Sequence, residues 1–169
     1  DLKDLGLGEF DYINCCGVLH HLESPEEGLK SLKSVLKDDG AIGVMIYGQY
    51  GRAGVYQMQN LMREFNEGVS DTQEKVDNCK KILNAIPPGN NWLTGGRNVK
   101  FDYERYGDVG IYDLFLHAQD KPFTVPKIYD LADECGMEIN FFLAENGNGK
   151  FAYSPEAHIQ DPEVIKEIK

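Results

Sequence analysis

The fold is decided by residues 10–47, FDYINCCGVLHHLESPEEGLKSLKSVLKDDGAIGVMIY. Phe10–Cys16 carries aromatic and β-branched side chains and precedes Gly17, which predicts a short strand that ends at a turn. Residues 41–47 form a nearly continuous apolar run, as expected of a strand covered on both faces. A strand, a helix and a second strand in this order predict a βαβ unit with a right-handed crossover.

The helix between these strands has a clear start signal. Ser24 can cap it, Pro25 suits its first position, and Glu27 has capping-box spacing from Ser24. Apolar residues at helical spacing mark the face that must be buried. These residues are Leu29, Leu32, Val35 and Leu36. Gly40 is expected to end the connection to the second strand.

Beyond the second strand, apolar stripes predict two amphipathic helices. The stripes comprise Val55, Met58, Leu61, Met62 and Phe65, then Val76, Cys79, Ile82, Leu83 and Ile86. Ser70 and Gln73 have the spacing of a capping box that would open the second helix, and Pro87 stops it. The following residues up to Tyr106 are loop-like and include the only tryptophan, Trp92.

The C-terminal part predicts further helices and a hairpin. A short helix carries Ile111, Leu114 and Phe115, and another helix follows Thr124 and closes at Gly136. The ranges 137–143 and 150–153 predict two strands, joined by a turn at 146–149. We expect residues 1–169 to form a single domain in which 52–123 is a helical and loop insertion.

Composition limits the class of protein. The chain has 169 residues, of which 41% are hydrophobic and 27% charged, as in a folded soluble domain. A net charge of −11 repels phosphate backbones and disfavours nucleic acid as a partner. No apolar run approaches the roughly 20 residues needed to span a bilayer, and no signal-peptide pattern opens the sequence. We expect a cytoplasmic protein that does not bind membranes, with reduced cysteines.

The same residues resemble a known family. Four features occur in the order of class I S-adenosylmethionine-dependent methyltransferases: the strand at 10–16, the segment Gly17–Leu22 with its two histidines, Pro25 and the helix ending Val35–Gly40. The resemblance implies an α/β fold with a partial Rossmann-like methyltransferase sheet, parallel strands and a closing antiparallel hairpin. The two predicted strands of residues 10–47 would then be strands four and five of the family sheet.

Two family features do not occur in the sequence. The glycine-rich loop after strand one holds the methionine part of S-adenosylmethionine, and an acidic residue after strand two binds its ribose hydroxyls. The stretches 6–8 and 147–149 do not replace that loop, because the first has no strand before it and the second is a predicted hairpin turn. We therefore expect the C-terminal portion of a methyltransferase, entered just before strand four, which is inactive as an isolated polypeptide.

The loop after the first strand is the predicted site of methyl transfer. The resemblance places Cys16, Gly17, Val18 and Leu19 at the cofactor. His20 and His21 are candidate catalytic residues, because an imidazole can accept a proton from the methyl acceptor or orient it. The alternative is one packed structural histidine and one solvated histidine. No metal site is expected here, because adjacent side chains point apart and no acidic cluster lies nearby in the sequence.

Candidate substrate residues follow the second strand and lie near the end of the insertion. Tyr47, Tyr50 and Arg52 would lie at the carboxyl edge of the sheet, where open α/β folds bind ligands. Asp113 and His117, together with Asp120 and the loop that carries Trp92 and Arg97, would form part of a lid. The alternatives are a turn with packed tyrosines at the first place and plain helix packing at the second.

Three functions remain open at this point. The leading hypothesis is a fragment of a methyltransferase that acts on a small molecule or another unidentified acceptor, with S-adenosylmethionine bound by the parent protein. The second is a non-catalytic assembly module, a homodimer formed through the exposed edge of strand four. The third is a fragment of another Rossmann-like enzyme, such as a nicotinamide-dependent one.

Overall fold

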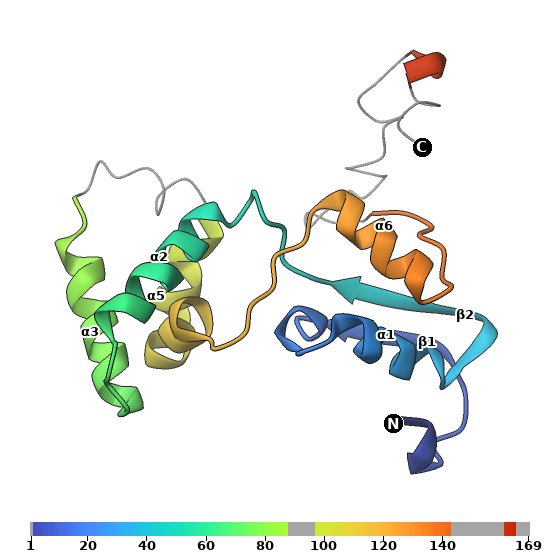
Figure 1. Ribbon diagram of the computed structural model, residues 1–169, viewed down its shortest axis with the longest axis horizontal. Coiled ribbons are helices and arrows are strands. Elements are labelled where there is room, and N and C mark those ends of the chain that lie inside the picture. Colours follow the sequence, from blue (N-terminus) through green and yellow to red (C-terminus); the bar gives the residue numbers. More distant parts are fainter. Residues whose placement is uncertain (1, 88–96, 143–160, 165–169) are drawn as a thin grey trace. The chain divides into compact units, whose positions relative to one another are not determined.

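The computed structural model describes residues 2–87, 97–142 and 161–164 (Figure 1). The chain divides into two compact units, Asp1–Ile128 and Tyr129–Lys169. Among the described residues, every helix is too short or too polar to cross a membrane.

The predicted βαβ unit is confirmed. After a short 3-10 helix, η1 (Leu2–Leu5), come β1 (Phe10–Cys16), the 3-10 turn η2 (Leu19–His21), α1 (Pro25–Lys33) and β2 (Leu36–Met45). The two strands pair in parallel, with Tyr12 opposite Ala41 and Cys16 opposite Met45. The α/β fold class expected from the sequence is therefore present.

Helix α1 begins as its sequence predicts. The Ser24 hydroxyl accepts a hydrogen bond from the Glu27 backbone N–H at 3.1 Å, and Pro25 is the first helical residue. Ser24 thus satisfies one of the donors that a helix start leaves open. Leu29 is buried, as expected of the apolar stripe. The helix ends at Lys33, however, so Val35, which is also buried, and Leu36, which begins β2, lie outside it.

Strand β2 differs from the prediction in its start and its coverage. It begins at Leu36, opposite Phe10, and residues 37–40 lie in an irregularity of the pairing, so Gly40 does not end the connection. Val44 and Met45 are each 42% exposed, so the strand is not covered on both faces. The faces of a strand are buried by elements that pack above and below its sheet, and the sheet that β1 and β2 form in the described part of the chain has only these two strands.

The described residues between the sheet and residue 117 form mainly helices (Figure 1). It contains α2 (Ala53–Phe65), α3 (Thr72–Ala85), α5 (Arg97–Ile111) and η3, a π-helical turn at Tyr112–Leu116. Their shared core consists of Val55, Met58, Met62, Val76, Cys79, Ile111, Leu114 and Phe115. The predicted assignment of 52–123 to an insertion stays a prediction.

Two local predictions in this segment are wrong. The cap of α3 is Asp71, whose carboxylate accepts from the Glu74 N–H at 2.8 Å, and not Ser70. A carboxylate at this position also interacts favourably with the helix dipole. Residues 97–106 are helical rather than loop-like, and α5 continues through a kink at Gly107, which has φ +56°. Trp92 lies outside the described residues.

Helix α6 (Val125–Glu134) is followed by a turn at Gly136, the residue predicted to close it. Gly136 adopts φ +62°, and the Met137 N–H donates to the Ala132 carbonyl at 2.9 Å. Residues 137–142 are not a strand, which corrects the first half of the predicted hairpin. A strand needs a neighbour for its backbone groups, and none pairs with it in the described parts of the chain. The predicted turn at 146–149 and the strand at 150–153 lie outside them.

Candidate functional site

The site is built on the carboxyl ends of β1 and β2. Gly17 follows β1 with φ +73°, a conformation that favours glycine. Its N–H donates to the Met45 carbonyl at 3.0 Å, which fixes the end of β1 against the end of β2. The chain then turns directly into η2, which carries both histidines.

A third segment, residues 117–124, joins these two strand ends. The Phe123 N–H donates to the Tyr47 carbonyl at 2.9 Å, and the Gln49 N–H donates to the Phe123 carbonyl at 2.8 Å. The Lys121 N–H also donates to the His20 carbonyl at 2.9 Å. These bonds bring Asp120, which is a hundred residues away in the sequence, to η2.

Four aromatic rings meet at this junction. The His20 ring centroid lies 4.1 Å from that of His21 and 4.1 Å from that of Tyr47. His21 in turn stacks on His117, with the centroids 3.9 Å apart. The prediction that the two adjacent histidine side chains point apart is therefore wrong. The rings of His20 and His21 lie close together, and the Asp120 carboxylate lies beside them.

His20 is fully buried. Neither of its ring nitrogens has a hydrogen-bond partner among the described residues. Burial, together with the nearby His21 and against the opposing effect of Asp120, lowers the pKa of His20 to about 4. The imidazole of His20 is therefore neutral at pH 7.

A polar network borders the rings. The Arg52 guanidinium lies over the Tyr47 ring, 3.4 Å from its centroid, in a cation–π contact. Arg52 Nη2 lies 3.8 Å from Asp120 Oδ2, and Gln59 Nε2 donates to the same oxygen at 3.0 Å. Gln59 Nε2 also donates to the Leu114 carbonyl at 3.0 Å, so the amide of α2 ties η3 to the 117–124 segment.

Tyr56, on α2, is close to this network. Burial, together with the negative charge of Asp120, raises the pKa of Tyr56 to about 12. Its phenol therefore keeps its proton throughout the neutral range, and it offers the site a neutral hydroxyl rather than an anion.

The structure brings together most of the predicted catalytic and substrate residues. His20, His21, Tyr47, Arg52 and His117 lie in one group. The exposed Asp113 joins it, because its carboxylate lies near the ligand nitrogens of His21 and His117. Tyr50 is 79% exposed, and the ring and cation–π contacts described above do not include it. Arg97 begins α5.

The four residues predicted to contact the cofactor differ in accessibility. Cys16 is exposed, and its thiol donates to the Asn14 side-chain oxygen at 3.1 Å. Val18 is 46% exposed, whereas Leu19 is buried and can offer a ligand only its backbone. Gly17, between Cys16 and Val18, has no side chain. These contacts stay predictions.

Sequence reasoning missed Gln59 and Tyr56, and it placed Asp120 only in a lid. Gln59 did carry a signal, since it lies within the apolar stripe of α2 next to Met58 and is buried to 2% exposure. A polar residue on a buried helix face needs a partner, which here is Asp120. Asp120 itself carried no such signal, because its neighbours in the sequence do not show what it pairs with.

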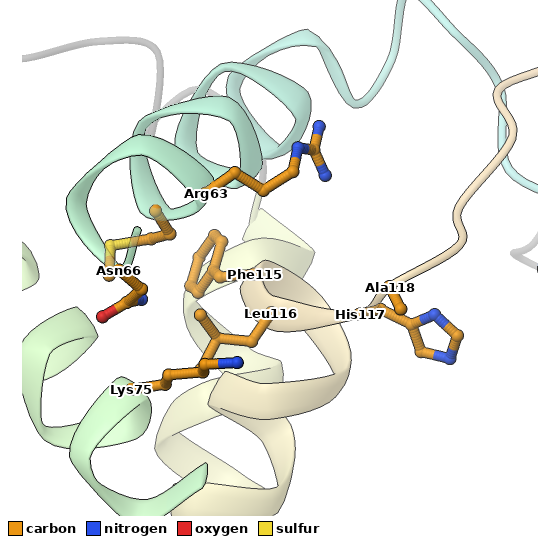
Figure 2. A pocket seen from close by; sticks show the side chains of 8 residues that line it. Arg63, Asn66, Lys75, Phe115, Leu116, His117 and Ala118 are labelled. Carbon is orange, nitrogen blue, oxygen red and sulfur yellow. The ribbon is translucent and has the colours of Figure 1, made fainter. Parts of the chain in front are cut away.

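A separate pocket of about 220 Å³ lies in the helical segment, between α2, α3 and η3 (Figure 2). It is lined by Met62, Arg63, Asn66, Lys75, Phe115, Leu116, His117 and Ala118. Figure 2 shows the His117 imidazole directed away from Phe115. The pocket is smaller than typical ligand sites of about 300–1,000 Å³. It shares only His117 with the site at the strand ends.

Comparison with known proteins agrees with the order of elements described above. Residues 1–44 match the family model of a methyltransferase domain. The resemblance to the methyltransferase family is thus confirmed. The match covers β1, the Gly17 loop, η2, α1 and most of β2.

Two relatives extend the comparison beyond residue 44. An uncharacterized protein of Synechococcus sp. is 36% identical over 131 residues, which are 77% of this chain and 31% of that protein. The structure of PKMT2 from Rickettsia typhi has a TM-score of 0.50 at 22% identity, and the match covers 80% of this chain and 26% of that one. At this identity the second likeness concerns the fold alone. The chain spans about a third or less of the length of either relative.

Proposed function

We propose that this chain forms part of an S-adenosylmethionine-dependent methyltransferase and that methyl transfer takes place at the carboxyl ends of β1 and β2. The backbone conformation of Gly17 is the observation that supports the proposal most directly. It turns the chain sharply with φ +73° at the end of β1, within the segment that matches the methyltransferase domain. Because it has no side chain, its backbone can approach a ligand closely. Open α/β sheets bind ligands at this edge.

The residues at the strand ends suit a reaction that depends on the position of the reactants. S-adenosylmethionine, when bound, supplies a methyl group already activated on a sulfonium. The chain's own contribution is to hold the acceptor in line, and such positioning can supply several kcal/mol of rate enhancement, up to about 7–11 in the best cases. Tyr47, Arg52 and His21 lie together on the acceptor side in this proposal. Neutral His20 supports them as a packed neighbour.

The test is a calorimetric titration of S-adenosylmethionine into the gene product that contains residues 1–169. We expect micromolar binding, a loss of about tenfold or more in Gly17→Ala, and no binding by residues 1–169 alone. Gly68→Ala is the matched control. Gly68 has φ +79°, so an alanine there has the same kind of backbone strain in a turn that is far from Gly17 in the sequence. Equal effects of the two substitutions, or binding of NADH in place of S-adenosylmethionine, would contradict the proposal.

A second candidate function is assembly. Tyr12 on β1 is 60% exposed and Phe10 is 40% exposed, and β1 pairs only with β2 among the described strands. We propose that a second copy of the chain can pair with the free edge of β1. Light scattering at tens of micromolar would show a dimer that Tyr12→Lys converts to a monomer. A monomeric unmodified chain would rule this function out.

A further inference from the structure

Three side chains of metal-ligand type converge beside the strand ends. His20 and His21 come from η2, and Asp120 comes from the segment that pairs with residues 47–49. One ligand atom from each residue lies within 4.8 Å of the other two. Nothing in the methyl-transfer proposal requires these three groups to meet.

The hydrogen bonds of His21 leave one of its nitrogens ready to bind a cation. Its Nδ1 lies 2.7 Å from the Gln119 carbonyl oxygen. A carbonyl can only accept, so Nδ1 carries the proton and the lone pair remains on Nε2. A backbone carbonyl that fixes the tautomer in this way is the usual second contact of a metal-binding histidine.

The bonds of Asp120 also leave one ligand atom available. Gln59 and Arg52 both approach Oδ2. Oδ1 is buried and has no hydrogen-bond partner within the described ranges, and the side chain as a whole is 1% exposed. An acceptor that is desolvated and left without a donor is unfavourable.

His20 points to the same conclusion. Both ring nitrogens are buried without a hydrogen-bond partner in the described part of the chain, and the residue is 0% exposed. Buried polar atoms are nearly always paired, so an unpartnered imidazole beside an unpartnered carboxylate oxygen indicates a ligand between them.

We propose that His20, His21 and Asp120 bind one divalent transition-metal ion, with Zn²⁺ as the preferred occupant. Two neutral imidazoles and one carboxylate are a set that zinc accepts, with a fourth position open to water or another ligand. Tetrahedral zinc needs ligand atoms about 3.3 Å apart, so small side-chain rotations would close the site. Mg²⁺ and Ca²⁺ prefer oxygen ligands and would bind weakly.

A second set shares His21 with the first but suits a metal less well. One ligand atom each of His21, Asp113 and His117 also lie within 4.8 Å of one another. The Gln119 N–H, however, donates to His117 Nδ1 at 3.2 Å, which places the His117 proton on Nε2. Asp113 is exposed, so its carboxylate is satisfied by water. The buried set is therefore the better site.

Arg52 sets a limit on the affinity. Its guanidinium lies 3.8 Å from Asp120 Oδ2 and opposes a second cation. The metal would occupy the other side of the carboxylate, at Oδ1, so Arg52 and Gln59 would orient the ligand from outside. We expect Arg52→Met to strengthen zinc binding, because it removes the opposing charge.

The experiment is a titration of Zn²⁺ into chelator-treated protein, followed by competition with a zinc-binding dye and by the absorption spectrum of the Co²⁺ form. We expect one ion per chain and a loss of about 100-fold or more in His21→Gln and in Asp120→Asn. The asparagine keeps the shape of Asp120 and an oxygen for Gln59. Cys16→Ser and Asp113→Asn are the controls, and both should bind as the unmodified protein does.

Each alternative result overturns the proposal. No binding, or equal affinity in His21→Gln and Asp120→Asn, would show that the buried set is not a site. A loss confined to Cys16→Ser would identify an adventitious thiol site, and a loss in Asp113→Asn would favour the other set. Thermal unfolding without Zn²⁺ checks that each variant is folded. A higher unfolding midpoint with Zn²⁺ then reports binding, since only proteins that bind the ion are stabilised. Metal binding is measured without S-adenosylmethionine, so its outcome does not depend on the proposed methyl transfer.

Discussion

The Arg52–Asp120 pair offers a quantitative test of the network at the strand ends. The two side chains are 16% and 1% exposed, and the nearest charged atoms are 3.8 Å apart. With an effective dielectric constant of about 20, Coulomb's law gives an attraction of about 4 kcal/mol, part of which offsets the cost of taking both charges out of water. Arg52→Met keeps most of the side-chain volume and removes the charge.

The expected loss of unfolding free energy in Arg52→Met is about 3 kcal/mol, because the substitution leaves a buried carboxylate with Gln59 as its remaining donor among the described contacts. Asp120→Asn should cost less, about 1–2 kcal/mol, since Arg52 can turn towards water. If the pair interacts, the double variant should lose about 2 kcal/mol less than the sum of the single variants. Urea unfolding followed by circular dichroism, in the presence of EDTA, measures all four proteins. Additive losses, with a coupling below about 0.5 kcal/mol, would refute the pair.

Three further predictions concern the core and the titratable groups. Phe115→Ala should cost about 3–5 kcal/mol in urea unfolding, because the ring is buried in the helical core, whereas Phe65→Ala, at a half-exposed position, should cost about 1 kcal/mol or less. Iodoacetamide should label the exposed Cys16 in the native protein and Cys79 only after unfolding, since burial raises the pKa of Cys79 to about 12. In metal-free protein, the lowered pKa of His20 means that the unfolded chain binds the additional proton, so stability should be highest above pH 6.5 and fall as the pH drops towards 4. A flat urea midpoint between pH 7 and pH 5 would contradict this.

The parts of the fold that the sequence predicted correctly are those set by local interactions. The start of α1 depends on Ser24, Pro25 and Glu27, which lie within four consecutive positions, and the end of α6 depends on Gly136. Apolar stripes likewise placed α2 and α3 because the helical period is visible within a few turns. Local signals were less reliable where two neighbours competed, as when Asp71 rather than Ser70 capped α3.

Properties that depend on distant residues were not predictable in this way. The exposure of Val44 and Met45 depends on which elements cover β2, and an apolar sequence reports only that the strand is suited to burial. The strand expected at 137–143 is absent from its described residues, 137–142, for the related reason that β propensity does not supply a pairing partner. The irregular pairing at 37–40 depends on the partner strand as well as on Gly40.

The candidate site contains residues placed by local interactions and one residue placed by distant contacts. This difference explains why the sequence predicted the two histidines but did not assign the Asp120 carboxylate to them. His20 and His21 follow a predictable strand and turn, so their position at the sheet edge could be inferred from nearby residues. Asp120 reaches them only because Phe123 pairs with both Tyr47 and Gln49 and because the Lys121 N–H bonds to His20. Gln59 then ties Asp120 to the helical core through Leu114. The geometry of the site therefore depends on the folding of α2 and η3, so substitutions in that core should alter ligand binding at the strand ends even where they touch no ligand.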